Sequence, residues 1–355
     1  MEEDGMLSAQ VESLGEMRLV EKPIPVPNDD SLLIKVEACA ICGSDVRIYR
    51  KGDARARYPI VIGHEIAGTV VQVGRKVTGF RAGDRVCAAP GHGCGECRYC
   101  RTGHSNVCIH PCPSIGYASD GGFAEYMVPP PNVVKLGFVN HIPPGVSSDH
   151  ASMSELLACC LNAQENTPVR EGDVVLIMGA GPAGCMMIEL SQRKGAKKVL
   201  LTQRSRHRLE VAERFSPDRI IASAEEDLLY AVMDETEGVG ADVIFVCAPS
   251  KDAQEQAFGL LAPRGRLNFF GGLPKDNCYI TTNANMIHYK EFLVGGASSS
   301  LARQNREALE LISTGQVHAD RYITHTFPLQ QITTAFETVE NRMAIKVVVH
   351  PGERT

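Results

Sequence analysis

The spacing of apolar and polar positions changes character once along the chain. Before residue 151, short apolar runs rich in Val, Ile and Ala are separated by turns that contain glycine and proline. Runs of this kind at 32–41, 66–74 and 84–90 predict β-strands. The first part of the chain is therefore predicted to be β-rich.

From residue 151 onward, helical and strand patterns alternate. The stretch 151–166 predicts one helix, and apolar runs at 173–181, 197–203 and 241–248 predict buried strands. The stretch 253–265 predicts a helix that ends at a glycine. Strands that alternate with helices are typical of βαβ units, which build a parallel sheet.

These patterns predict an α/β protein with two domains. A β-rich domain is expected over residues 1–155, and a doubly wound parallel-sheet domain over 156–295. The remaining segment, 296–355, is expected to return to the first domain. A length of 355 residues is enough for two hydrophobic cores.

Composition narrows the class of protein. The net charge of −6 gives no basic surface for nucleic acid or for an anionic membrane. No apolar run approaches the roughly 20 residues that span a bilayer, and the acidic N-terminus lacks a signal-peptide core. The 13 cysteines, without a secretion signal, favour a reducing compartment. We therefore expect a cytoplasmic protein without nucleic-acid or membrane partners.

Four of the cysteines form a compact motif with the spacing C-x2-C-x2-C-x7-C within residues 91–112. Four thiolates this close together can complete a tetrahedral shell around Zn²⁺. The motif therefore predicts a structural zinc lobe. Two alternatives remain: cysteines that are free or disulfide-linked, and an Fe–S cluster, although the bacterial ferredoxin motif ends in x3-C-P. The predicted ligands are Cys94, Cys97, Cys100 and Cys108.

A glycine motif, G-x-G-x-x-G, follows the predicted strand at 173–181 and opens a predicted helix. This context favours a dinucleotide-binding turn, in which glycines allow the backbone to approach the pyrophosphate and the helix N-terminus faces the phosphates. A glycine turn without a ligand is the alternative. The predicted cofactor-binding residues here are Gly179, Gly181, Pro182, Ala183 and Gly184.

The end of the next predicted strand bears on the choice of nucleotide. NAD sites usually have Asp or Glu at this position, but this chain has Gln203, followed by Arg204 and Arg206. Arginine can pair with a 2′-phosphate. We therefore favour NADP(H), with NAD(H) as the alternative; the arginines could also be the solvated start of a helix.

A second group of potential zinc ligands lies outside the cysteine motif. Cys42 follows a predicted strand, His64 and Glu65 precede another, and Glu155 lies in the predicted helix. Thiolate, imidazole and carboxylate suit a zinc site that keeps one position open. Asp45 could hold the second nitrogen of His64. The spacing alone does not bring these residues together.

With these motifs in this order, the chain resembles the zinc-dependent medium-chain dehydrogenases, the alcohol and polyol dehydrogenase family. The resemblance implies a GroES-like catalytic domain that carries two zincs, a Rossmann domain, and an active site between them. It extends over nearly the whole chain and rests on Cys42–Asp45, Gly63–Glu65, Gly79–Val86, the cysteine motif, Gly121–Tyr126 and the glycine turn.

The resemblance assigns roles to individual residues. It implies that Cys42 and His64 bind the catalytic zinc, and that Glu65 binds it or lies behind it. Glu155 matches a ligand position that is Glu in polyol-type members. Those members often have Glu-Pro, whereas here Leu156 follows Glu155, so direct zinc binding by Glu155 is left open.

The implied reaction is reversible hydride transfer between a secondary alcohol and a nicotinamide. Ser44 is expected to relay a proton, and Tyr49, Tyr117 and Ser298 to contact a polyol, sugar alcohol or sugar phosphate. Alternatives are a threonine-type hydroxy amino acid or other alcohol dehydrogenase and, in another class, a non-catalytic nucleotide-binding protein. The family resemblance also implies a homodimer or homotetramer and an alcohol or ketone as the small-molecule partner.

Overall fold

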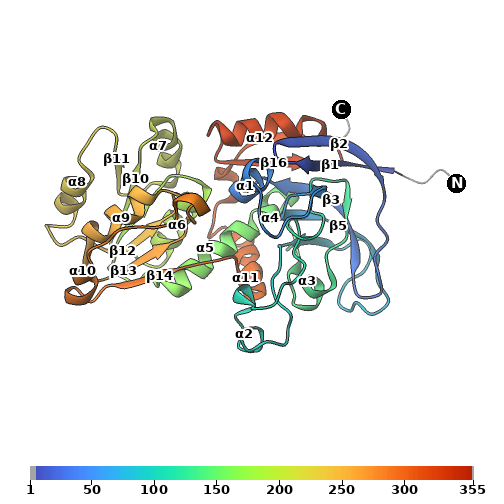
Figure 1. The fold of residues 1–355 in the computed structure, drawn as a ribbon, viewed down its shortest axis with the longest axis horizontal. Coiled ribbons are helices and arrows are strands. Elements are labelled where there is room, and N and C mark those ends of the chain that lie inside the picture. Colours follow the sequence, from blue (N-terminus) through green and yellow to red (C-terminus); the bar gives the residue numbers. More distant parts are fainter. Residues whose placement is uncertain (1–4, 354–355) are drawn as a thin grey trace. The chain divides into compact units, whose positions relative to one another are not determined.

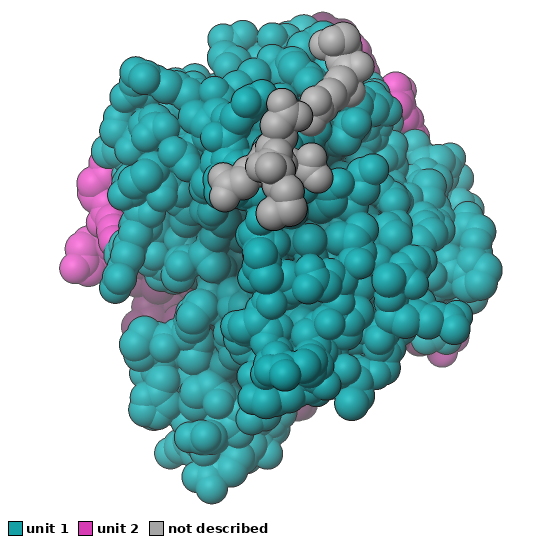
Figure 2. All heavy atoms as spheres, turned by 90° about the vertical axis from the view of Figure 1, so that its right-hand side faces the viewer, with its two compact units in different colours: residues 1–158, 300–355 teal, residues 159–299 magenta. Residues whose placement is uncertain are grey.

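The computed structural model describes residues 5–353 and divides into two compact units (Figures 1 and 2). Unit 1 contains the residues up to 158 and those from 300 onward, and unit 2 contains residues 159–299. The division at residue 158 falls within helix α5 (Ser154–Asn166), as does the predicted boundary at 155/156. None of the helices in the described part of the chain combines the length and apolar character that crossing a bilayer requires.

Two β-sheets form the framework of unit 1. Its strands are β1 (Gly5–Ser13), β2 (Glu16–Pro23), β3 (Leu32–Ala40), β4 (Ile60–Val61), β5 (Glu65–Val73), β6 (Arg85–Ala88), β7 (Tyr126–Met127), β8 (Val139–His141), β15 (Ile323–Pro328) and β16 (Lys346–His350). The smaller sheet has the order β2-β1-β4. The larger has the order β15-β16-β3-β5-β6-β8, and β7 also pairs with β3.

Strand β3 is the centre of the larger sheet, and its sequence reflects that position. Of its residues, Lys35 is exposed and Glu37 is half-buried, while the rest of the strand is buried. Antiparallel pairing joins β3 to β5 on one side and to β16 on the other. The segment from residue 300 onward therefore contributes directly to the sheet that carries the N-terminal site residues.

Short helices surround these sheets. Apolar side chains from both ends of the chain pack together in the unit 1 core, where the Phe123 and Phe336 rings meet edge to face at 5.6 Å. The helical segments are α1 (Gly43–Lys51), α2 (Arg98–Arg101), α3 (Pro131–Lys135), α4 (Ser148–Ser152), α11 (Ala302–Ser313) and α12 (Ile332–Glu340), with 3₁₀ turns at Ser105–Val107, Ala319–Arg321 and Leu329–Gln331.

Unit 2 is built on one parallel sheet of six strands. The strands are β9 (Val174–Met178), β10 (Lys198–Gln203), β11 (Arg219–Ala222), β12 (Ala241–Val246), β13 (Leu261–Phe269) and β14 (Leu293–Gly296). Their order is β11-β10-β9-β12-β13-β14, and all neighbours are parallel. This is the 3-2-1-4-5-6 order of the Rossmann fold.

Helices connect these strands, as the alternating sequence pattern predicts. Besides α5, they are α6 (Pro182–Arg193), α7 (Arg206–Ala212), α8 (Leu228–Glu235), α9 (Lys251–Leu260) and α10 (Ala284–Tyr289), with 3₁₀ turns at Glu213–Phe215 and Lys275–Asn277.

Two predicted helices differ from the observed ones. The expected single helix over 151–166 is two helices, α4 and α5, because Met153 N donates to His150 O in a tight i→i−3 turn. The expected helix over 253–265 ends at Leu260, where β13 begins. Pro263 disfavours a helical conformation at the residue before it, and Arg264 adopts a positive φ of 61°.

Candidate active site

The start of helix α1 organises the first part of the site. Cys42 is the N-cap residue, and its backbone N–H donates to Asp45 Oδ2 at 2.9 Å. The other carboxylate oxygen, Oδ1, accepts from Gly63 N at 3.2 Å and lies 3.0 Å from His64 Nδ1. Asp45 is fully buried. One carboxylate therefore joins the helix start to the loop that carries His64.

This contact determines which nitrogen of His64 carries the proton. A carboxylate accepts hydrogen bonds, so Nδ1 donates to Asp45 and Nε2 is left to act as a ligand. Nε2 lies 3.2 Å from Ser44 Oγ. Burial opposes protonation of the ring, but the nearby Asp45 carboxylate raises the pKa of His64 above its ordinary value. The contact between Asp45 and His64 that the sequence predicted is present.

Three potential ligands converge beside this contact. One donor atom from each of Cys42, His64 and Glu65 lies within 4.8 Å of the other two. A thiolate, an imidazole and a carboxylate form a donor set that fits zinc. Glu155 is also buried. Among the described residues, its carboxylate is not part of the group whose donor atoms lie within 4.8 Å of one another.

A lysine that the sequence analysis missed lies behind Glu65. Lys346 Nζ donates to Glu65 Oε1 at 2.6 Å and also contacts Oε2; both side chains are almost fully buried. Burial lowers the pKa of Lys346, but Glu65, Cys42 and Glu155 together raise it above its ordinary value. Glu155 therefore belongs to the electrostatic surroundings of this pair. A single lysine within the apolar run AIKVVVH was the available signal.

The cysteine motif forms a separate cluster in unit 1. The Sγ atoms of all four cysteines lie within 4.8 Å of one another. Cys97 Sγ is 3.5 Å from Cys100 Sγ and 3.8 Å from Cys108 Sγ, and Cys94 Sγ is 4.0 Å from Cys100 Sγ. A tetrahedron with Zn–S bonds of about 2.3 Å places its sulfurs about 3.8 Å apart. The sulfurs therefore fit a zinc ion.

Backbone donors favour the thiolate form of Cys94 and Cys97, whereas burial raises the pKa of Cys100. The amide of Cys100 donates to Cys97 Sγ at 3.5 Å, and this bond contributes most to lowering the pKa of Cys97, to about 6. The amides of Glu96 and Cys97 both donate to Cys94 Sγ. Deprotonated sulfur is the form that binds zinc.

The predicted substrate residues separate into two groups. Tyr117 is buried beside the ligands, with its ring centre 5.2 Å from that of His64. Tyr49 is not beside them: its hydroxyl donates to Gly15 O, and its ring packs against Phe336 in the core. Tyr49 is five positions after Ser44 in α1, so the two side chains lie on different faces of the helix. Tyr49 is therefore part of the core and not of the candidate site.

The glycine turn in unit 2 has the close packing that its motif requires. A Cβ atom on Gly184 would lie 1.9 Å from the carbonyl oxygen of Gly179. Gly179 itself has a φ of +117°, which disfavours other residues. Gly181 is the N-cap of α6, and Pro182 is its first residue. Glycine is therefore needed both for the turn and for the contact of α6 with it.

Polar residues near this turn differ partly from the prediction. Gln203 ends β10 and accepts from the amide of Arg204, while Arg206 is 80% exposed and lies near Glu225. Arg208, which the sequence analysis did not select, donates to Ala180 O at 3.4 Å. Ser298 is exposed in unit 2, where its carbonyl accepts from Asn162. Contact of Ser298 with a substrate stays a prediction.

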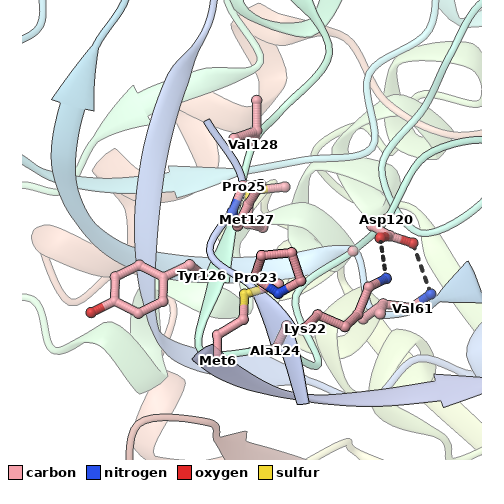
Figure 3. A pocket seen from close by; sticks show the side chains of 11 residues that line it. Met6, Lys22, Pro23, Pro25, Val61, Asp120, Ala124, Tyr126, Met127 and Val128 are labelled. Atoms are coloured by element: carbon pink, nitrogen blue, oxygen red, sulfur yellow. Dashed lines mark hydrogen bonds and ion pairs between the residues drawn. The ribbon is translucent and has the colours of Figure 1, made fainter. Parts of the chain in front are cut away.

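A pocket of about 160 Å³ lies elsewhere in unit 1, near β1 and β2 (Figure 3). At its edge, Lys22 pairs with Asp120 at 3.0 Å, and Asp120 also accepts from Val61 N. Its apolar lining includes Met6 and Met127. None of the predicted site residues lines it.

Comparison with known proteins identifies the family. Residues 28–137 match the alcohol dehydrogenase GroES-like domain, and residues 182–314 match the zinc-binding dehydrogenase domain. A sorbitol dehydrogenase of Halalkalibacterium halodurans is 32% identical, covering 95% of this chain and 96% of its own. The chain belongs to the zinc-dependent medium-chain dehydrogenases. The predicted family and class of enzyme are confirmed.

Two further relatives refine this picture of the dehydrogenase. A D-arabitol-phosphate dehydrogenase of Enterococcus avium is 30% identical, covering 97% of this chain and 96% of its own. The crystal structure of a zinc-binding dehydrogenase of Sinorhizobium meliloti bound to NADP has a TM-score of 0.91 at 29% identity, covering 98% of this chain and 100% of that chain. The predicted combination of a GroES-like domain and a Rossmann domain is confirmed.

Proposed function

We propose that this dehydrogenase transfers hydride reversibly between a secondary alcohol of a polyol, sugar alcohol or sugar phosphate and a nicotinamide cofactor. The observation that carries this proposal is the convergence of Cys42, His64 and Glu65 beside the Ser44 hydroxyl. The activities named for the sorbitol and D-arabitol-phosphate relatives support the substrate class.

The chain's own residues would bind the metal and move the proton. Cys42 and His64 would hold zinc, with Glu65 held behind them or as a third ligand, and Glu155 nearby. Zinc, when bound, supplies Lewis acidity toward an alcohol oxygen. Asp45 keeps the His64 ring in the tautomer that binds metal.

Ser44 would exchange a proton with the substrate hydroxyl, since its own hydroxyl both donates and accepts. Its position at the first turn of α1, 3.2 Å from His64 Nε2, puts the Ser44 hydroxyl beside a candidate metal ligand and supports this role. We expect Ser44→Ala to lower turnover while zinc content is retained; full activity in this variant would exclude Ser44 from the relay.

The proposed cofactor is NADP(H), bound at the turn of Gly179, Gly181, Pro182, Ala183 and Gly184. The side chain at the end of β10, Gln203, is uncharged and would not repel a 2′-phosphate. Arg204 and Arg206 are exposed and could pair with that phosphate. A kcat/KM for NAD at least tenfold above that for NADP would contradict this preference.

The test of the proposed function is an initial-rate screen of the zinc-loaded enzyme. The panel contains polyols, their phosphates, hydroxy amino acids and simple alcohols, each with NAD and NADP. Reduction of cofactor by a polyol or its phosphate, lost in Cys42→Ser, would support the proposal. Turnover of threonine alone, or none at all with nucleotide still bound, would contradict it.

We also propose that the enzyme is a homodimer or homotetramer. Strand β14 lies at the edge of the parallel sheet and exposes Leu293 by 66% and Val294 by 41%. Unpaired edge strands with apolar side chains favour pairing with a second chain. A monomeric mass in light scattering, at the concentration used for the assay, would contradict this proposal.

A further inference from the structure

A strongly basic segment lies close to the candidate metal site. Residues 47–57 include five basic side chains and one acidic side chain, Asp53, although the whole chain has a net charge of −6. Arg50 is bound to Glu340 at 2.7 and 2.8 Å. The rest of the segment keeps an excess of positive charge, and such an excess attracts anionic ligands. The basic residues are Arg47, Arg50, Lys51, Arg55 and Arg57.

Arg55 connects this segment to the site. Its guanidinium carbon lies 4.0 Å from the centre of the Tyr117 ring, and that ring lies 5.2 Å from the His64 ring. One aromatic ring therefore separates the guanidinium from a candidate zinc ligand. The Arg55 side chain is 44% exposed, so a ligand can reach it.

The guanidinium of Arg55 is held in a fixed orientation. Its Nε and Nη2 groups donate to the two Asp53 oxygens at 2.9 and 3.0 Å, and Nη1 lies 3.2 Å from His92 Nε2. Because arginine has only donors, His92 Nε2 accepts. Guanidinium has five N–H donors, and beyond these three contacts Arg55 also hydrogen-bonds the Tyr117 side chain, which leaves one donor for a ligand.

The single carboxylate does not cancel the local charge. Asp53 also accepts from Arg47 Nη2 at 3.1 Å, so two guanidinium groups share one acidic side chain. Arginine groups that are already oriented lose less entropy when they bind a phosphate. The arrangement therefore favours a doubly charged anion over a neutral ligand.

We propose that Arg55 binds the phosphate group of a phosphorylated polyol whose reacting carbinol lies at the Cys42, His64 and Glu65 cluster. This inference rests on the proposed function and narrows its substrate class. The distances from the His64 ring to Tyr117 and from Tyr117 to Arg55 limit the span that is needed, and an extended five- or six-carbon polyol phosphate can cover it.

The test is calorimetric binding of D-sorbitol 6-phosphate and of D-sorbitol to the zinc-loaded enzyme. Saturating reduced cofactor keeps phosphate out of the dinucleotide site. We expect the wild type to prefer the phosphate, and Arg55→Gln to weaken its binding about tenfold or more, with a much smaller effect on D-sorbitol.

Two further variants separate phosphate binding from a purely structural role. Asp53→Asn removes the competing negative charge but keeps a side-chain oxygen that can accept from Arg55, so we expect it to tighten phosphate binding about twofold or more. If the ion pair between Arg55 and Asp53 only stabilised the fold, Arg55→Gln and Asp53→Asn would change the affinity for the phosphate in the same direction. Arg75→Gln is the matched control, because Arg75 makes a similar two-bond pair with Asp29 on the surface. It should leave both affinities unchanged.

Three results would overturn the inference: failure of the phosphate to bind, equal affinity for both ligands in the wild type, or equal losses for both ligands in Arg55→Gln. Turnover of D-sorbitol by the same enzyme preparation, assayed separately with oxidised cofactor, reports on hydride transfer. Arg55-dependent phosphate binding without turnover of any alcohol in the panel would contradict the proposed function and leave the anion site standing.

Discussion

The two ligand clusters of unit 1 are assembled in opposite ways. The cysteine lobe takes all of its sulfurs from one short stretch, 94–108, and its sulfurs are spaced for a closed tetrahedron. The second cluster gathers Cys42, His64 and Glu65 and supports them with Asp45 and Lys346. The sulfurs of the cysteine lobe come from one contiguous stretch, so their spacing depends little on the rest of the fold. The second cluster forms only when several separate strands and loops are correctly packed.

This difference suggests different roles. Four sulfurs leave no position for a reactant, which is typical of a structural site, while three mixed ligands leave one position open. The second cluster also has a hydroxyl, a tautomer-fixing carboxylate and a buried ion pair around it. Variants in the two clusters should therefore affect different properties of the enzyme.

The largest expected effect is on catalysis. Cys42→Ser should lower kcat/KM by at least about a thousandfold, because the metal contributes several kcal/mol to stabilising the transition state. Zinc should fall from two equivalents to one, while the melting temperature changes little. Steady-state rates, metal analysis and thermal unfolding would be measured on the same sample.

The matched variant is Cys97→Ser in the lobe, which should show the reverse pattern. We expect a loss of at least about 2 kcal/mol in unfolding free energy, with kcat/KM of the folded protein kept within about tenfold. If both variants lost activity equally while stability was retained, the separation into structural and catalytic clusters would be wrong.

The next effect concerns stability. Lys346→Met would leave the Glu65 carboxylate buried without its cation, which typically costs about 3–5 kcal/mol. Chemical denaturation of the metal-free protein would measure this loss, because bound zinc would itself offset the Glu65 charge. The double variant Lys346→Met with Glu65→Gln should recover much of it, because no charge is then left unpaired. No recovery would show that Lys346 stabilises the fold through contacts other than this pair.

A smaller effect is expected at the residue that orients His64. Asp45→Asn should weaken zinc binding or activity about 10–100-fold, as for other carboxylates that hold a ligating histidine. Chelator competition can measure the affinity of each cluster. The affinity of the cysteine lobe should be unaffected, and a parallel loss in both clusters would point to general destabilisation instead.

The smallest expected effect is a pH-dependent change in unfolding free energy at a pair outside both clusters, His350 and Asp149. A hydrogen bond from His350 to Asp149, 2.8 Å long, raises the pKa of His350. The pair therefore stabilises the fold fully below the unfolded-state pKa of about 6.5, and this contribution is lost as pH rises through the higher folded-state pKa. Asp149→Asn should lower unfolding free energy by less than about 1 kcal/mol, mainly at acidic pH.

Denaturation of both forms across the pH range would measure this difference. His350→Gln should show the same stability at acidic pH as Asp149→Asn, because either change removes the pair. A difference between wild type and Asp149→Asn that grows with rising pH would contradict the assignment. The contribution of the His350 and Asp149 pair to the unfolding free energy can then be subtracted when variants of the two clusters are compared at acidic pH.

The sequence predicted features formed by neighbouring residues, such as the cysteine motif. It predicted contacts between distant residues only where the family resemblance implied them. Cys94 and its partners could be read from spacing, because a contiguous motif carries its own geometry. Lys346 and Arg55 were missed because their partners, Glu65 and Tyr117, are remote in the chain. Tyr49 was misplaced because proximity to Ser44 in sequence does not mean a shared helix face.

The pair of Glu65 and Lys346 also has a consequence for synthesis of the protein on the ribosome. The two residues are separated by 281 positions. At about 5–20 residues per second, Glu65 is made on the order of 15–60 seconds before its counter-ion exists. During that interval the carboxylate cannot be buried as part of an ion pair. The cluster of Cys42, His64 and Glu65 therefore gains its buried ion pair late in translation, after the strands of the unit 2 sheet have been made.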